Sequence, residues 1–250
     1  MSSGGSVVQF TISARGKPAA APIHKFIKDS FSDIPIEQIE SFFGFTEPCT
    51  LYGGRVFNGA ELSRYDLRSL YKLGINLRIP LTNHYATEAE YTSCLPFLEK
   101  HYRPRNSVII TNDNLANWIR ADFPAYRVEA SVIKNINTLA KVEKAYKIYD
   151  TVILPMESNE DEEFLLSIPE KERVMLFANA GCAMTCPSKI CYTSVSKVNK
   201  DGDISLWQCS QSLKPRDMFG MLDFDLEYLQ DLGFHRFKLL RSRPGRMTGF

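Results

Sequence analysis

The sequence predicts a closed (β/α)8 barrel of the TIM type, built as one α/β domain whose irregular part lies near the N-terminus. Strand and helix patterns alternate along most of the 250 residues, and parallel strands need crossover helices of about this length. Eight such units in roughly 250 residues is the usual size of this barrel. An open doubly wound sheet is the alternative, but no GxGxxG motif follows the first predicted strand.

Eight short apolar runs, several of them rich in β-branched residues, predict the strands. They cover residues 7–13, 49–54, 75–82, 107–111, 126–133, 151–154, 173–180 and 234–240. The second run, CTLYGG, reads as a strand that ends in a glycine turn. The stretch between the first two runs is long and poorly patterned, so we expect the chain to depart from an ideal barrel there.

Apolar residues at helical spacing between these runs predict the connecting helices. They cover 34–43, 61–73, 87–101, 115–123, 138–148, 160–168 and about 215–232. Pro35 is tolerated in the first turn of the first helix, and Gly74 is a candidate C-cap of the second. In the third helix Thr87 and Glu90 form a predicted capping box, and Pro96 predicts a kink or a break.

Composition and length predict one soluble domain. We divide the chain into a flexible start at 1–6, a barrel domain at 7–243 that includes a cysteine-rich loop at 181–210, and a tail at 244–250. A hydrophobic content of 44%, a charged content of 24% and a net charge of +1 are ordinary values that do not point to nucleic acid. With no signal peptide and no long apolar run, we predict a cytoplasmic protein without a membrane span. Both homo- and hetero-oligomers stay open.

Four of the six cysteines lie in one stretch, where Cys182, Cys186, Cys191 and Cys209 are spaced C-x3-C-x4-C-x17-C. Thiolates that converge on one point bind a soft metal or an iron–sulfur cluster. We predict a [4Fe–4S] cluster, with zinc as the alternative. Zinc sites usually contain tighter C-x2-C knuckles, and Pro187 directly after a cysteine occurs in some cluster-binding runs. Incidental buried thiols are a further alternative, and disulfides are disfavoured in a reducing compartment.

The other two cysteines are expected to stay apart from this group. Cys94 lies in the helix after the third predicted strand, away from the carboxyl ends of the strands. Cys49 begins the second predicted strand, which would place it at the opposite end of the barrel from the cysteine-rich loop.

Polar residues at the carboxyl ends of the predicted strands are the candidates for catalysis and binding, because barrels of this type place their active sites there. The candidate catalytic residues are Asn179, Glu129 and Lys238. The candidate substrate contacts are Arg55, Asn83, Asn112 and Arg241. Further polar residues at these ends are His84, Asp113, Ser131 and Glu157.

Several of these candidates have an alternative, structural role. Asn112 and Asp113 are equally suited to capping the next helix. For His84, a surface or hydrogen-bonding role is favoured over that of a general base. Strand alternation would place Lys238 and Arg241 on opposite faces, unless the last strand ends near residue 240.

Five segments, in this order along the chain, resemble those of a known family: LYGGRVFN, ELSRYDLRSLYKLGINLRIPLTN, SVIITNDNLANWIRADFPAYRVEAS, NAGCAMTCPSKICY and LKPRDMFGMLDFDLEYLQDLGFHRFKLLRSR. The fourth is similar to the signature N-x-x-C-x3-C-P-x-R-x-x-H-Y of one branch of that family. The family is the collagenase-like peptidase family, catalogued as peptidase family thirty-two of unassigned mechanism. The resemblance covers roughly residues 50–243.

The resemblance implies a TIM-like barrel that carries a four-cysteine iron–sulfur cluster. Several members are implicated in oxygen-independent hydroxylation of RNA bases or quinone precursors, and others are described as collagenases. This chain departs from the pattern at Lys189, where the branch has arginine, and at Cys191, near the position of its histidine. Arg241 and Ser242 replace the glycine and arginine of the closing motif.

These observations predict an iron–sulfur enzyme of the hydroxylase type that acts on an RNA base or a small aromatic or quinone precursor. A peptidase is the first alternative. The second alternative is a non-catalytic protein that binds RNA or a partner and whose metal only stabilises the loop. No GxSxG or HExxH motif is present, and cysteines packed into one loop suit a cluster better than nucleophilic catalysis.

Overall fold

The computed structural model describes residues 7–186, 188–210 and 222–240. Eight parallel strands close into a barrel in the order β1 to β8, with β8 paired to β1. The strands are β1 (Gln9–Ser13), β2 (Ile39–Phe43), β3 (Asn76–Leu81), β4 (Ser107–Ile110), β5 (Arg127–Ala130), β6 (Thr151–Ile153), β7 (Val174–Phe177) and β8 (Arg236–Leu239). This architecture confirms the predicted (β/α)8 barrel.

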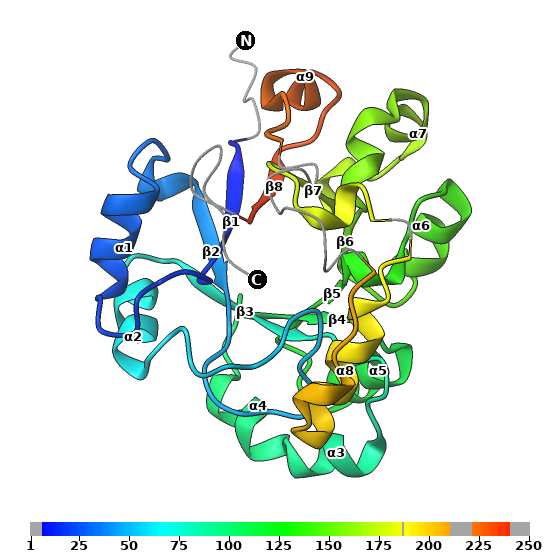
Figure 1. Ribbon diagram of the computed structural model, residues 1–250. Coiled ribbons are helices and arrows are strands. Elements are labelled where there is room, and N and C mark those ends of the chain that lie inside the picture. The colour runs from blue at the N-terminus through cyan, green and yellow to red at the C-terminus, as the bar shows by residue number, and fades with distance from the viewer. Residues whose placement is uncertain (1–6, 187, 211–221, 241–250) are drawn as a thin grey trace.

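Helices surround the strands as an outer ring, and α8 lies instead over the carboxyl ends of the strands (Figure 1). In the described residues they are α1 (Ile23–Ser30), α2 (Arg64–Lys72), α3 (Glu88–Ser93), α4 (Leu95–His101), α5 (Asp113–Asp122), α6 (Leu139–Tyr146), α7 (Glu162–Ser167), α8 (Cys191–Asp201) and α9 (Leu226–Asp231). Among these residues, no helix has both the length and the apolar character that a bilayer crossing requires. The predicted start at 1–6 and tail at 244–250 lie outside the described residues.

Local sequence signals set several helix ends as predicted. The side chains of Thr87 and Glu90 form the expected capping box at α3. The predicted helix over 87–101 breaks at Cys94 into α3 and α4, just before Pro96. Asn112 caps α5, since its Oδ1 accepts from the backbone N–H groups of the second and third residues after it.

The predicted helix over 34–43 is wrong. Its chain forms a single 3₁₀ turn at Ile36–Gln38 and then the strand β2. The register between β1 and β2 shifts at Glu40, where β2 has one residue more than its partner. This bulge interrupts the two-residue alternation of apolar side chains, so their spacing imitates a helix.

The predicted strand over 49–54 is also wrong, because this segment forms turns that pack across the end of β3. A Cβ atom on Gly53 would lie 2.4 Å from the carbonyl oxygen of Thr82, so only glycine allows this close approach. The helix α1 fills the stretch that lacked a clear pattern. The helix predicted over about 215–232 begins outside the described residues, and α9 covers its last part.

The side chains that point into the barrel form two layers. Towards the carboxyl ends of the strands, an apolar layer is made by Phe43, Ile109, Ile153, Met156, Met175, Phe177 and Ala180. Below it lies a polar layer around the buried side chain of Arg78, which forms an ion pair with Glu129 and donates to the Thr11 hydroxyl. The outward faces of the strands pack with the helices in a separate, larger apolar core.

A second charged group closes the amino-terminal end of the barrel. Glu40, at the bulge of β2, accepts from Arg127 at 3.1 Å and from Arg236 at 3.3 Å. Burial raises the pKa of Glu40, but the charges of Arg236, Arg78 and Arg127 outweigh it and hold that pKa below its ordinary value. Burial in turn lowers the pKa of Arg78 to about 9, opposed by the charge of Glu40. The interior therefore depends on opposite charges that compensate one another.

We expect the substitution Glu129→Gln to destabilise the protein strongly. It would leave the Arg78 guanidinium buried without its ion-pair partner, which typically costs about 3–5 kcal/mol. Urea unfolding measures the loss of unfolding free energy. The control Glu170→Gln removes an exposed pair with Arg173 and should change stability by less than about 1 kcal/mol. Equal stabilities of the two variants would contradict this account of the interior.

Candidate functional site

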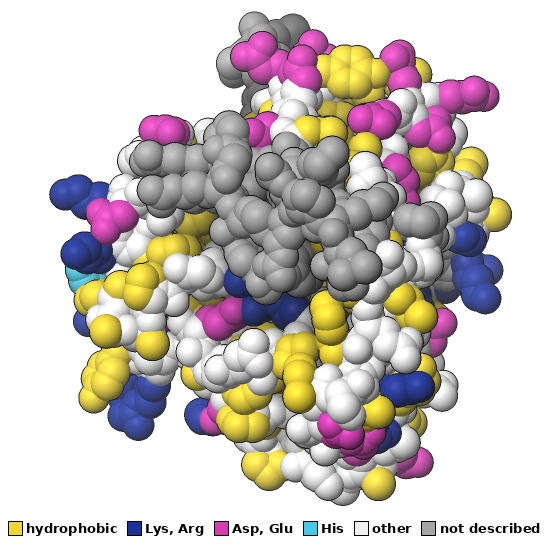
Figure 2. Space-filling model, in the orientation of Figure 1, with side chains coloured by type: hydrophobic (Ala, Val, Ile, Leu, Met, Phe, Trp, Pro, Cys, Tyr) yellow, Lys and Arg dark blue, Asp and Glu magenta, His cyan; other side chains and the backbone are white. Residues whose placement is uncertain are grey.

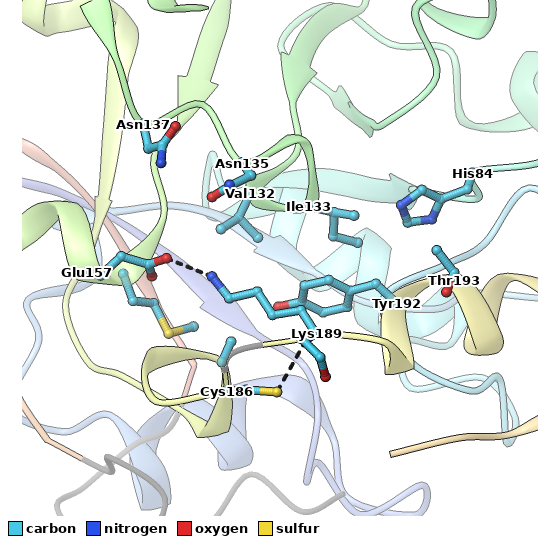
Figure 3. A pocket seen from close by; sticks show the side chains of 13 residues that line it. His84, Val132, Ile133, Asn135, Asn137, Glu157, Cys186, Lys189, Tyr192 and Thr193 are labelled. Carbon is cyan, nitrogen blue, oxygen red and sulfur yellow. Dashed lines mark hydrogen bonds and ion pairs between the residues drawn. The ribbon is translucent and has the colours of Figure 1, made fainter. Parts of the chain in front are cut away.

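A pocket of about 460 Å³ lies at the carboxyl ends of the strands, beside the cysteine-rich loop. One wall is His84, which follows β3, and another is the segment 132–137 after β5. Glu157 follows β6, and the loop and the start of α8 complete the lining (Figure 3). The pocket is therefore built where the barrel fold places its catalytic groups.

A charge pair spans one side of the pocket. The Lys189 ammonium lies 2.6 Å from a carboxylate oxygen of Glu157, and Figure 3 shows the lysine side chain extending across the pocket towards it. The backbone N–H of Lys189 also donates to the sulfur of Cys186 at 3.3 Å. Lys189 adopts a left-handed backbone conformation with φ of 47°. One residue thus joins the cysteine-rich loop to the end of β6.

His84 has a structural contact rather than the geometry of a base. Its Nδ1 lies 3.2 Å from the hydroxyl oxygen of Ser196, whose side chain also donates to the backbone carbonyl of Tyr192. Burial, reinforced by the charge of Lys134, lowers the pKa of His84, so the ring is neutral at pH 7. A neutral ring can still accept a proton, so it is the contact of Nδ1 with Ser196, and not the pKa, that favours the hydrogen-bonding role.

The helix α8 was not predicted, and two asparagines attach it to the barrel. Asn83 at the end of β3 donates to the carbonyl oxygens of Thr50 at 2.8 Å and Ser196 at 2.9 Å. On α8 itself, Asn199 donates to the carbonyl oxygen of Arg55 at 2.9 Å and accepts from the N–H of Phe57 at 2.8 Å. The segment after β2 therefore holds the helix that begins with Cys191.

The four cysteines of the loop are half-buried. Burial, and then the negative charges of Cys182, Cys186 and Cys209, raise the pKa of Cys191 to about 12. Burial and the charges of Cys186 and Cys209 likewise raise the pKa of Cys182. Charge effects of this kind act over short distances. Even so, residues 7–186, 188–210 and 222–240 contain no group of three or more His, Cys, Asp or Glu side chains already arranged to hold a metal.

Lys238 on β8 points into the mouth of the barrel. Its ammonium lies 4.4 Å from the ring centroid of Phe43 and 5.7 Å from that of Phe177. Burial, and then the charges of Arg78 and Arg55, lower its pKa to about 7. A neutral amine is therefore available there near neutral pH, which is the chemistry a catalytic lysine needs. Arg241 lies outside the described residues.

The remaining candidates have defined structural partners. Glu129 lies in the polar layer with Arg78, and Asn179 accepts from the N–H of Leu240 at 2.9 Å. Arg55 pairs with Glu61 and stacks over the Phe45 ring. Their roles in catalysis or substrate binding stay predictions, as does that of Asn112.

Among the residues that line the pocket, Tyr192, Asn135 and Asn137 were not named as candidates from the sequence. Tyr192 is the last residue of the segment NAGCAMTCPSKICY but was not named as a site residue, and Asn137 belongs to no motif. Asn135 has a φ of 50°, and asparagine tolerates this left-handed conformation better than most residues do. Since a turn asparagine is common in any loop, no sequence signal separates this one from the others.

Figure 2 shows the face of the molecule that Figure 1 looks onto. Acidic side chains gather at the top of this face, and basic side chains lie mainly at its left and right edges. Near the middle, acidic and basic side chains lie side by side in a hollow.

Comparison with known proteins gives a match in structure. No family model and no curated protein matches the sequence. Among solved structures, the chain is similar to the U32 peptidase Mk0906, with a TM-score of 0.62 and 13% sequence identity. The similarity covers 97% of this chain and 96% of that one. At this identity the likeness establishes a shared barrel fold over nearly the whole length.

We expect the substitution Asn83→Ala to loosen the connection between α8 and the barrel. It removes hydrogen bonds to three backbone carbonyls, and each carbonyl left unsatisfied typically costs about 1–3 kcal/mol. Thermal unfolding should show a clear fall in Tm, and proteolysis should cut within residues 188–210 sooner. Asn114→Ala, at an exposed position of α5, is the control and should change neither. A normal Tm for Asn83→Ala would contradict the assignment.

We expect Lys238→Met to change how stability depends on pH. The lysine has a pKa of about 7 in the folded protein, against an ordinary value of 10.5. Between these values the unfolded chain binds one more proton, so the unfolding free energy of the wild type rises with pH, by up to about 1.4 kcal/mol per unit. The variant lacks this slope, so it should be the more stable protein at pH 7 and lose its advantage towards pH 10.

Urea unfolding at pH 7, 8, 9 and 10 measures this difference for wild type and variant. Lys25→Met, at an exposed position of α1, is the control and should follow the wild type throughout. Parallel curves for wild type and Lys238→Met would show that the buried amine is protonated at neutral pH.

Proposed function

We propose that this protein is an iron–sulfur enzyme of the hydroxylase type that acts on a planar, polar substrate at the mouth of the barrel. The observation that carries the proposal is that Cys186 lines a pocket at the carboxyl ends of the strands, and that Cys182, Cys186 and Cys209 are close enough to Cys191 to raise its pKa. A [4Fe–4S] cluster supplies single-electron chemistry or an open iron when it is bound.

The donor set fits such a group in type and number. Cys182, Cys186, Cys191 and Cys209 provide four thiols within range of one another's charge, and four thiolates are what a [4Fe–4S] cluster needs. Because these side chains are not yet arranged around one point, we propose that binding of the cluster draws the loop together. Zinc would need the same thiolates, and it is the alternative occupant.

The pocket suits a planar substrate about the size of a nucleobase or a quinone precursor. Its volume of about 460 Å³ lies within the range of small-molecule sites. Tyr192 offers an aromatic face, and the side-chain amides of Asn135 and Asn137 offer both donors and acceptors. The Lys189–Glu157 pair can orient polar groups of the substrate. Lys238 does not line this pocket. Its amine, with a pKa of about 7, can exchange a proton near neutral pH with a group that reaches the rings of Phe43 and Phe177.

A peptidase is the second candidate, since the similar solved structure is that of a protein named as a peptidase. The described residues offer it little support. The contact between Ser196 and His84 is the arrangement nearest to a hydrolytic pair that we find in them. Ser196 is fully buried and donates its hydroxyl proton to the carbonyl of Tyr192, so it is not placed to attack a substrate.

Anaerobic purification followed by iron, sulfide and zinc analysis tests the proposal. We expect wild-type protein to be brown, to absorb near about 400 nm and to contain iron and sulfide. Cys182→Ala and Cys186→Ala should lose both and unfold at a lower temperature, because ligand binding is coupled to folding of the loop. Cys94→Ala is the matched control, since it lies outside the loop, and should keep its iron.

Other results would favour the alternatives. Colourless wild-type protein that carries zinc would support a zinc ion that only stabilises the loop. Cleavage of gelatin by metal-free protein would overturn the redox proposal in favour of a peptidase. Iron-loaded protein that does not cleave gelatin agrees with the hydroxylase type.

A further inference from the structure

The two cysteines outside the loop lie next to each other. The sulfur atoms of Cys49 and Cys94 are 3.4 Å apart, although 45 positions separate them in the sequence. Because residues 49–54 form turns after β2 and not a strand, Cys49 does not lie at the opposite end of the barrel as predicted. Cys94 lies at the break between α3 and α4. Both side chains are half-buried.

The environment makes the two thiols unequal. A hydrogen bond from Cys49 is the main cause that lowers the pKa of Cys94, to about 7. Burial acts in the opposite direction, and hydrogen bonds from Thr50 lower the pKa further. The same contact, together with burial, raises the pKa of Cys49. The nearby carboxylates of Glu90 and Glu47 favour protonated thiols, so they do not cause the lowered value. Cys94 is therefore the thiolate of the pair, and Cys49 is the thiol that stabilises it.

We propose that Cys49 and Cys94 form a reversible disulfide by exchange with a small-molecule disulfide such as oxidised glutathione. The Cys94 thiolate attacks one sulfur of that disulfide, the S–S bond breaks, and one glutathione leaves as a thiolate that takes the proton of Cys49. Cys49 then attacks the Cys94 sulfur and releases the second glutathione. Two protein thiols and one disulfide thus become one protein disulfide and two small thiols. The sulfurs need to approach from 3.4 Å to about 2.05 Å.

The proposed disulfide would act on the segment that supports α8. Cys49 is followed by residues whose carbonyls accept from Asn83 and Asn199, the two side chains that attach α8 to the barrel. A covalent link from this segment to the start of α4 would restrict its movement and close a long loop of the chain, which stabilises the folded state. The inference concerns a different pair of thiols from the proposed cluster and stands independently of it.

Exposure of the folded protein to oxidised glutathione tests the proposal. The reaction is stopped with acid and N-ethylmaleimide, and the protein is digested with trypsin. Cys49 lies in the peptide 29–55 and Cys94 in the peptide 79–100, and neither contains another cysteine. We expect these two peptides to be linked, with a mass two hydrogens below their sum, and the link to disappear with dithiothreitol. Wild-type Tm should rise on oxidation by roughly 5–10 °C.

Two single variants separate the roles of the thiols. In Cys49→Ser the second step is blocked, so glutathione should accumulate on Cys94. In Cys94→Ser the attacking thiolate is absent, so Cys49 should stay largely unmodified and the Tm should not respond to oxidant. Links confined to the four loop cysteines, or equal modification of the two variants, would overturn the proposal. Iron content, measured in the same samples, reports separately on the cluster.

Discussion

The buried guanidinium of Arg78 is the constraint on which the rest of the barrel depends. Its side chain is only 2% exposed, and a charge in such a place is tolerated only when it is paired and hydrogen-bonded. Glu129 on β5 supplies the ion pair, and Thr11 on β1 accepts a hydrogen bond. These contacts join strands that are distant in sequence and on different sides of the barrel. The closed barrel therefore brings together the groups that compensate this charge.

The closed barrel brings the carboxyl ends of the strands together, and the loops that follow the strands attach there. Both the nitrogen and the oxygen of the Asn83 side-chain amide form hydrogen bonds. Asn83, at the end of β3, therefore connects the segment after β2 to α8. Asn199 repeats the connection from the side of the helix. Through these contacts the rigid interior determines where the cysteine-rich loop and its pocket lie. A loop in such a position can change its chemistry without disturbing the barrel.

The six cysteines fall into two groups with different chemistry. In the loop, burial and then the negative charges of neighbouring cysteines raise the pKa of Cys182 and Cys191, which favours neutral thiols until a cation compensates the charge. At the break between α3 and α4, one thiol instead stabilises the thiolate of the other. The first group is suited to ligand binding and the second to exchange with disulfides. The segment after β2 lies between them, so it connects the two groups physically.

The sequence by itself determined the fold class, seven of the eight strands and the clustering of four cysteines, because these depend on local pattern and spacing. It misplaced β2, since one extra residue at Glu40 gave a strand the spacing of a helix. Only the tertiary structure decided that Cys49 meets Cys94, that Lys238 lies between aromatic rings, and that α8 docks on Asn83. Such contacts join distant parts of the chain, and local periodicity carries no information about them.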